Sequence, residues 1–146
     1  MPAHVNNFRE LIVYTKTRVL SKEVFELSKR LPRDENFSLK EQIRRSARSI
    51  GANIAEAWGK RRYEKHFVSK LTDANAEQME TQHWIDTACT ECGYFDKDNS
   101  ERLLKACDEI GRMLSGMMQK ADLFCGHRPF TVREEQAAYG SGDDDF

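Results

Sequence analysis

The chain has 146 residues and a net charge of −1, with 39% hydrophobic and 32% charged residues and only three prolines and eight glycines. This composition fits a single domain built from helices. No stretch approaches the roughly 18 apolar residues of a membrane span, and the start lacks a basic segment followed by an apolar run, so neither membrane insertion nor export is expected and we predict a cytoplasmic protein.

The first predicted helix covers residues 7–31. Its apolar residues recur at spacings of seven, four, three and four, which places them on one stripe of a helix. They are Val13, Leu20, Val24, Leu27 and Leu31. Pro32 ends this helix, and the polar residues that follow form a turn.

The second helix is predicted to begin after Ser38, which forms a capping box with Glu41 three residues later. Its buried stripe consists of Leu39, Ile43, Ala47, Ile50 and Ile54. Small residues flank this stripe, and Gly51 costs about 1 kcal/mol relative to alanine inside a helix. A close crossing with a neighbouring helix, or a local bend, is therefore expected at Gly51.

Two further helices are predicted over residues 64–92 and 100–125. The stripe of the third helix is Phe67, Leu71, Ala74, Gln78, Gln82, Ile85, Cys89 and Cys92, and that of the fourth is Leu103, Cys107, Ile110, Leu114, Met117, Ala121 and Phe124. The fourth stripe alternates spacings of four and three without a break, which is the pattern of a helix-bundle seam. Gly93 and Gly126 are expected to end these two helices.

Residues 127–146 are polar and end in the acidic sequence DDDF. Such a segment buries too little apolar surface to become ordered. We therefore predict a bundle over residues 1–126 and a flexible acidic tail over 127–146, whose removal leaves folding and assembly intact. Four long helices joined by short turns predict an all-α, antiparallel up-down-up-down four-helix bundle without strands.

The second and third helices also carry a family resemblance. The segments QIRRSARSIGANIAEAWGK, HFVSKL and AEQMETQHWIDTACTECGYF resemble the bacterial four-helix-bundle proteins named for the intervening sequences of 23S ribosomal RNA. The resemblance begins at Phe8 and extends to about Met118. This family is similar in turn to the accessory proteins of diversity-generating retroelements. That resemblance implies a homo-oligomeric ring, a pentamer, that binds nucleic acid and a reverse transcriptase.

Basic residues are concentrated in the first half of the chain. Residues 1–70 contain sixteen basic and eight acidic side chains, a net charge of +8, whereas residues 71–146 contain seven and sixteen, a net charge of −9. The candidate nucleic-acid-binding residues lie on the second helix and the turn after it: Lys40, Arg44, Arg45, Arg48, Lys60, Arg61, Arg62 and Lys65. Guanidinium groups suit phosphates, and the neighbouring Trp58 and Tyr63 can stack on bases. The alternative is that basic and acidic helices neutralise each other within or between subunits.

Polar residues on the small-residue flank of the second helix suggest a structural role. Asn53 and Glu56 stand among alanines there. We predict that they are interface residues, hydrogen-bonded to Gln78, Glu80 or Gln82 of the third helix, and that these bonds fix the register of the two helices.

No cofactor, metal site or catalytic motif is predicted. Cys89 and Cys92 form a Cys-x-x-Cys pair at a helix C-terminus, where the helix dipole disfavours a thiolate, and no second pair completes a zinc site. Glu80 and His83 show the spacing of a di-iron ligand motif only once. The sequence therefore predicts a non-enzymatic oligomer that binds RNA or DNA without strong sequence specificity. The alternative is an oligomeric scaffold for a protein partner such as a reverse transcriptase.

Overall fold

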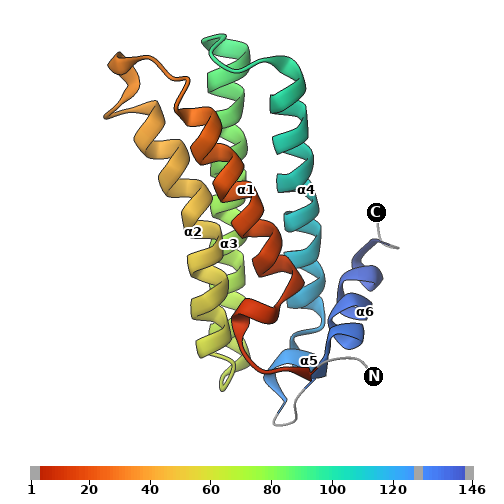
Figure 1. Ribbon diagram of the computed structural model, residues 1–146. Helices are drawn as coiled ribbons and strands as arrows, with labels where there is room; N and C mark the ends of the chain where they lie inside the picture. Colours follow the sequence, from red (N-terminus) through yellow and green to blue (C-terminus); the bar gives the residue numbers. More distant parts are fainter. Residues whose placement is uncertain (1–3, 127–129, 144–146) are drawn as a thin grey trace.

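The computed structural model describes residues 4–126 and 130–143 (Figure 1). Its helices are α1 (Ile12–Ser28), α2 (Leu39–Gly59), α3 (Glu64–Asp86), α4 (Lys97–Gln119), α5 (Ala121–Cys125) and α6 (Val132–Asp143). Short 3-10 turns precede α1 and α2 at Phe8–Glu10 and Arg33–Glu35, and a π-helical turn, Thr87–Glu91, extends α3. The all-α prediction is confirmed. One exception is a small antiparallel pair between β1 (His4–Val5) and β2 (Phe130–Thr131), which the helical patterns did not predict.

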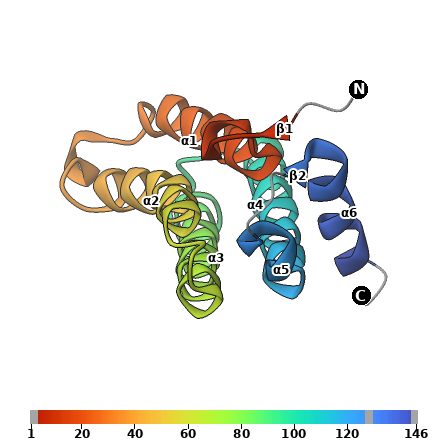
Figure 2. The same cartoon turned by 90° about the horizontal axis from the view of Figure 1, so that it is seen from below.

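The four long helices lie side by side. Successive helices run in opposite directions and are joined by turns at alternating ends (Figure 1). Viewed along the helix axes, α1 lies between α2 and α4, and α3 contacts the same two helices from the other side (Figure 2). The C-terminal α6 packs outside this group, against α4. In the described part of the chain, no helix combines the length and hydropathy needed to cross a lipid bilayer.

The predicted stripes form the core. All members of the α1, α2 and α4 stripes are buried, from Val13 on α1 to Phe124 on α5. The α3 stripe is buried as far as Ile85 except at Gln82, which is half-buried while the neighbouring Thr81 is buried. After Ile85 the stripe fails, because the π-helical turn changes the angular phase of the residues after it. Ala88 is buried there, whereas Cys89 is half-buried and Cys92 is exposed.

Helix ends differ from the predicted ones where side chains supply the caps. Ser38 precedes α2 as predicted, but its hydroxyl donates to Glu35 rather than capping the helix. The fourth helix begins at Lys97 rather than Ser100. There the Asp96 carboxylate accepts a hydrogen bond of 2.8 Å from the Asn99 backbone N–H and so caps the first turn.

Gly51 marks the predicted close crossing. A Cβ atom added to Gly51 would lie 3.0 Å from the Thr17 hydroxyl and 3.5 Å from the Tyr14 ring, so α1 uses the space that glycine leaves on α2. The helix α2 continues unbroken from Leu39 to Gly59, so this close approach does not interrupt it.

The C-terminal segment differs from the predicted disordered tail. Residues 130–143 form β2 and α6, and Phe130, Ala138 and Tyr139 are buried. The buried Glu135 carboxylate accepts a hydrogen bond of 2.7 Å from the Ile12 backbone N–H, at the start of α1. The segment has no long apolar stripe of its own. It becomes ordered because it makes these contacts with distant parts of the chain. The remaining tail residues, 127–129 and 144–146, lie outside the described residues.

Candidate nucleic-acid interface

The predicted basic residues fall into two groups along α2. One group, from Lys40 to Arg48, occupies the first half of the helix, and the other, from Lys60 to Lys65, surrounds the turn into α3. At a rise of 1.5 Å per residue, Arg44 and Lys60 are roughly 25 Å apart along the helix axis. The structure therefore does not bring the eight residues together into one compact patch.

Arg44 is held in place by α1. Its Nε donates a hydrogen bond of 2.6 Å to the hydroxyl of the buried Ser28, which in turn donates to the backbone carbonyl of Phe25 at 2.7 Å. The guanidinium carbon also lies 4.6 Å from the centre of the Phe25 ring. Because only Nε is engaged, the two terminal nitrogens are free to form a forked contact with a phosphate.

Arg48 joins the first group to α1. It lines one surface groove with Lys40 and Arg44, and a second groove with Arg18 and Lys22. We call these five residues, Arg18, Lys22, Lys40, Arg44 and Arg48, the α1–α2 basic face. None of the five forms an ion pair with a carboxylate of residues 4–126 or 130–140.

The sequence prediction missed two members of this face, Arg18 and Lys22. Both lie on α1, four residues apart and outside the buried stripe, and both side chains are exposed. Their i, i+4 spacing places them on one side of the helix. That signal was available in the sequence, but only the packing of α1 against α2 joins them to Arg48.

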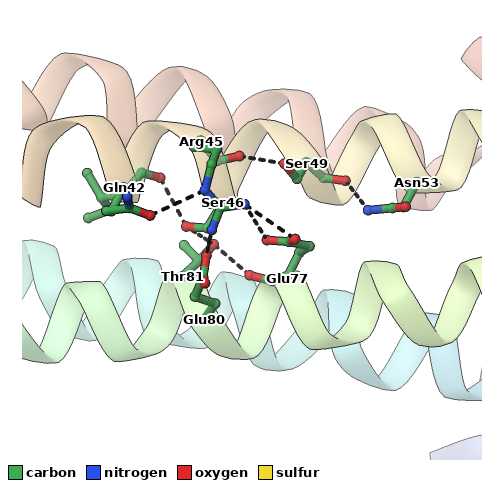
Figure 3. A network of polar contacts seen from close by, with 9 residues as sticks. Gln42, Arg45, Ser46, Ser49, Asn53, Glu77, Glu80 and Thr81 are labelled. Atoms are coloured by element: carbon green, nitrogen blue, oxygen red, sulfur yellow. Dashed lines mark hydrogen bonds and ion pairs between the residues drawn. The ribbon is translucent and has the colours of Figure 1, made fainter. Parts of the chain in front are cut away.

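Arg45 has a different environment from Arg44. Its guanidinium forms ion pairs with Glu77, at 3.4 Å, and with Glu80, both on α3 (Figure 3). Arg45 also lines the groove beside Lys40 and Arg44. Since two carboxylates already neutralise it, Arg45 acts mainly in the contact between α2 and α3.

Two of the four basic residues in the second group lie over aromatic rings. Arg61 lies 3.5 Å from the centre of the Trp58 ring and donates from Nε to the Trp58 carbonyl at 2.9 Å. Burial lowers the pKa of Arg61 below its usual range. Arg62 lies 5.7 Å from the Tyr63 ring centre, and Lys60 and Lys65 are exposed. Arg61 therefore covers one face of the Trp58 ring, which was predicted to stack on bases.

The predicted network from Asn53 and Glu56 to glutamines of α3 is not formed. Asn53 donates to the Ser49 carbonyl on its own helix, at 2.9 Å (Figure 3). Glu56 does bind α3, but through an ion pair of 2.8 Å with Lys70, which lowers the pKa of the Glu56 carboxyl.

The glutamines pair with other partners. Gln78 donates to Asn75, and Gln82 donates to Gln78 and to Asp108 of α4. Of the predicted interface residues, Glu80 does connect α2 with α3, through Arg45. A buried hydrogen bond of 2.9 Å from Thr81 to Ser46 completes this connection (Figure 3). Ser46 and Thr81 were not predicted, because their small side chains become a polar pair only once the two helices are in register.

The four cysteines are free thiols. Burial raises the pKa of Cys107 to about 12, so its thiol is un-ionised at neutral pH. Among the residues with described positions, no three His, Cys, Asp or Glu side chains gather as ligands for a metal ion.

Comparison with known proteins identifies related sequences and a related structure. The model of a family described as 23S rRNA-intervening sequence protein matches residues 9–116. A crystal structure of a protein of unknown function from the S23 ribosomal protein family of Bacteroides thetaiotaomicron superposes with a TM-score of 0.67 at 28% sequence identity. The match covers 74% of this chain and 99% of that one. No curated protein matches the chain.

Proposed function

Because the chain belongs to the 23S rRNA-intervening sequence protein family, we propose that it is a non-enzymatic protein that binds RNA or DNA through the α1–α2 basic face. One observation carries this proposal. Arg18, Arg44 and Arg48 converge without carboxylate partners among the described residues, whereas the neighbouring Arg45 has two. Cations that serve only to neutralise acidic helices would be paired as Arg45 is.

The expected chemistry is recognition of phosphates. Arg44 is oriented by Ser28 and Phe25 before any ligand arrives, so little side-chain entropy remains to be lost when a phosphate binds. Contacts of this kind position a nucleic acid but do not distinguish its bases. Binding should therefore be strong at low salt and show little preference for sequence.

The protein is further proposed to act as a homo-oligomer. The resemblance to ring-forming bundle proteins supports a pentamer. The alternative function is an oligomeric scaffold that binds a protein partner such as a reverse transcriptase. This alternative is favoured by Val19, which is 55% exposed and lies between Arg18 and Lys22. An exposed apolar side chain inside a basic face also suits a protein contact.

The test compares two variants of equal net charge. In one, Arg44 and Arg48 are replaced by glutamine; in the matched control, Lys97 and Lys105 of α4 are replaced instead. Fluorescence anisotropy with labelled RNA and DNA is measured over a range of salt concentrations. The logarithm of affinity should fall with the logarithm of salt. Loss of two phosphate contacts should reduce that slope by about 1.4 on single strands, and the control should behave as wild type.

Three results would contradict the proposal. Wild-type protein that retains neither RNA nor DNA at low salt would remove its basis. So would equal weakening by the two double variants, because binding would then depend on net charge and not on this face. Light scattering and circular dichroism of each variant establish that oligomer and helices persist. If the Arg44 and Arg48 variant loses its oligomer before its binding, the scaffold function replaces this one.

A further inference from the structure

Phe37 is a large apolar side chain without a visible structural role. It lies in the turn between α1 and α2 and is 91% exposed. The other phenylalanines of residues 4–126 and 130–143 are buried or half-buried. No ring or cation packs on Phe37 in the described chain. Both faces of this ring are therefore available to a ligand.

The ring lines the groove that holds three of the five residues of the basic face. Phe37 lines this groove together with Lys40, Arg44 and Arg48. The three cations follow one another at intervals of four residues, over about 12 Å of helix axis. Small residues, Ser49 and Ala52, line the same groove and leave room for a chain to lie along it.

We infer that this groove binds a single strand, with one base stacked on Phe37 and successive phosphates on Lys40, Arg44 and Arg48. The inference rests on the proposed function and specifies the form of nucleic acid. In a duplex the base faces are covered by their neighbours, so an exposed phenyl ring would gain nothing from it. Single strands expose these faces, and aromatic side chains stack on them with little regard to sequence.

The groove also contains a carboxylate, that of Glu41. Its charge opposes phosphate binding at one point, and Arg45 is already neutralised by α3. The strand is therefore expected to pass on the side of Lys40 and Arg44, of which Arg44 contacts α1 through Ser28 and Phe25. Stacking on Phe37 adds affinity that does not depend on charge.

The experiment measures binding of oligo(dT), of an unstructured RNA of the same length, and of a duplex of that length at one low salt concentration. Phe37→Ala should weaken binding of both single strands about ten-fold, as expected for loss of one stacked base. It should leave duplex binding unchanged. Phe37→Trp should retain single-strand affinity. The matched control is Met79→Ala, which removes a 58% exposed apolar side chain from α3 and should change neither.

The outcomes separate this inference from the proposed function. If no oligonucleotide binds, the proposed function itself fails. If the duplex binds as well as the single strands and Phe37→Ala changes neither, nucleic-acid binding stands and the single-strand inference is overturned. If Phe37→Ala instead changes the mass measured by light scattering, Phe37 belongs to a contact between copies of the chain, which also overturns the inference.

Discussion

Gly116 lies where α4 touches the backbone of α6, and its replacement by alanine should weaken that contact. A Cβ atom at this position would lie 2.6 Å from the Ala138 carbonyl oxygen and 2.9 Å from the Tyr139 Cα. Both are backbone atoms, so no side-chain rotation relieves the clash. The whole of α6 would have to move away from α4, together with the buried Tyr139 ring and the Glu135 carboxylate bound to α1.

The expected change in the free energy of unfolding is the balance of two opposing effects. Overpacking a well-filled contact costs about 1–3 kcal/mol, whereas alanine is favoured over glycine inside a helix by about 1 kcal/mol. The clash should prevail, because it involves two backbone atoms. We expect Gly116→Ala to lower the free energy of unfolding by about 1–2 kcal/mol, which for a chain of this size lowers Tm by about 3–8 °C.

The assay is chemical and thermal denaturation followed by circular dichroism, with hydrogen exchange of the α6 amides as a local probe. Gly59→Ala is the matched control, because a Cβ added to Gly59 meets nothing within 4 Å, and it should leave stability equal or higher. The decisive comparison is Gly116→Ala in a chain truncated after Gly126. There the clash is absent and alanine should stabilise. Stabilisation by Gly116→Ala in the full chain as well would refute the contact with α6.

Burial raises the pKa of the Glu135 carboxyl above its usual 4.5, so the folded protein holds the carboxyl proton more tightly than the unfolded chain does. The stabilisation from this protonated carboxyl is complete below about pH 4.5 and is lost as pH rises through the folded-state pKa. The free energy of unfolding of wild type relative to Glu135→Gln should therefore fall as pH rises above 4.5, and a difference independent of pH would contradict this. A thiol reagent at pH 8 should modify the exposed Cys92 in the folded protein and reach Cys107, which is fully buried, only on denaturation; equal rates for the two would refute the predicted burial. Glu41→Gln should strengthen RNA and DNA binding several-fold at low salt, because the Glu41 carboxylate repels phosphates anywhere in the groove that it lines, and this gain should vanish at high salt; unchanged affinity would mean that the strand does not occupy this groove.

Local periodicity in the sequence determined most of the bundle. The unbroken alternation of four and three along α4 places Leu103, Ile110 and Leu114 on one side, and any folded state must bury that side. Gly51 was predicted to mark a close approach or a local bend, since a glycine inside a strong helix has a cost that either would offset, and the structure shows the close approach. These features depend on residues within one or two helical turns, which is why the sequence alone was sufficient.

The C-terminal α6 could not be predicted in the same way. Its ordering depends on the space beside Gly116 and on the free amide of Ile12, which lies 123 residues from Glu135 in the sequence. The segment itself is short and mostly polar, so its own pattern indicates disorder. Partners so distant in the chain become visible only when α1 and α4 have been packed together.

Arg44 and Arg45 of the candidate site also have environments that the sequence alone could not predict. They are adjacent and chemically identical, and helical geometry requires only that they point about 100° apart. The tertiary structure decides that Arg44 meets Ser28 and Phe25 of α1 and keeps its terminal nitrogens free, while Arg45 meets Glu77 and Glu80 of α3 and is neutralised. The sequence determined which side of α2 is apolar, because that depends on neighbours along one helix. Which cations remain available to a ligand depends on the helices that pack beside it, and only the fold specifies those.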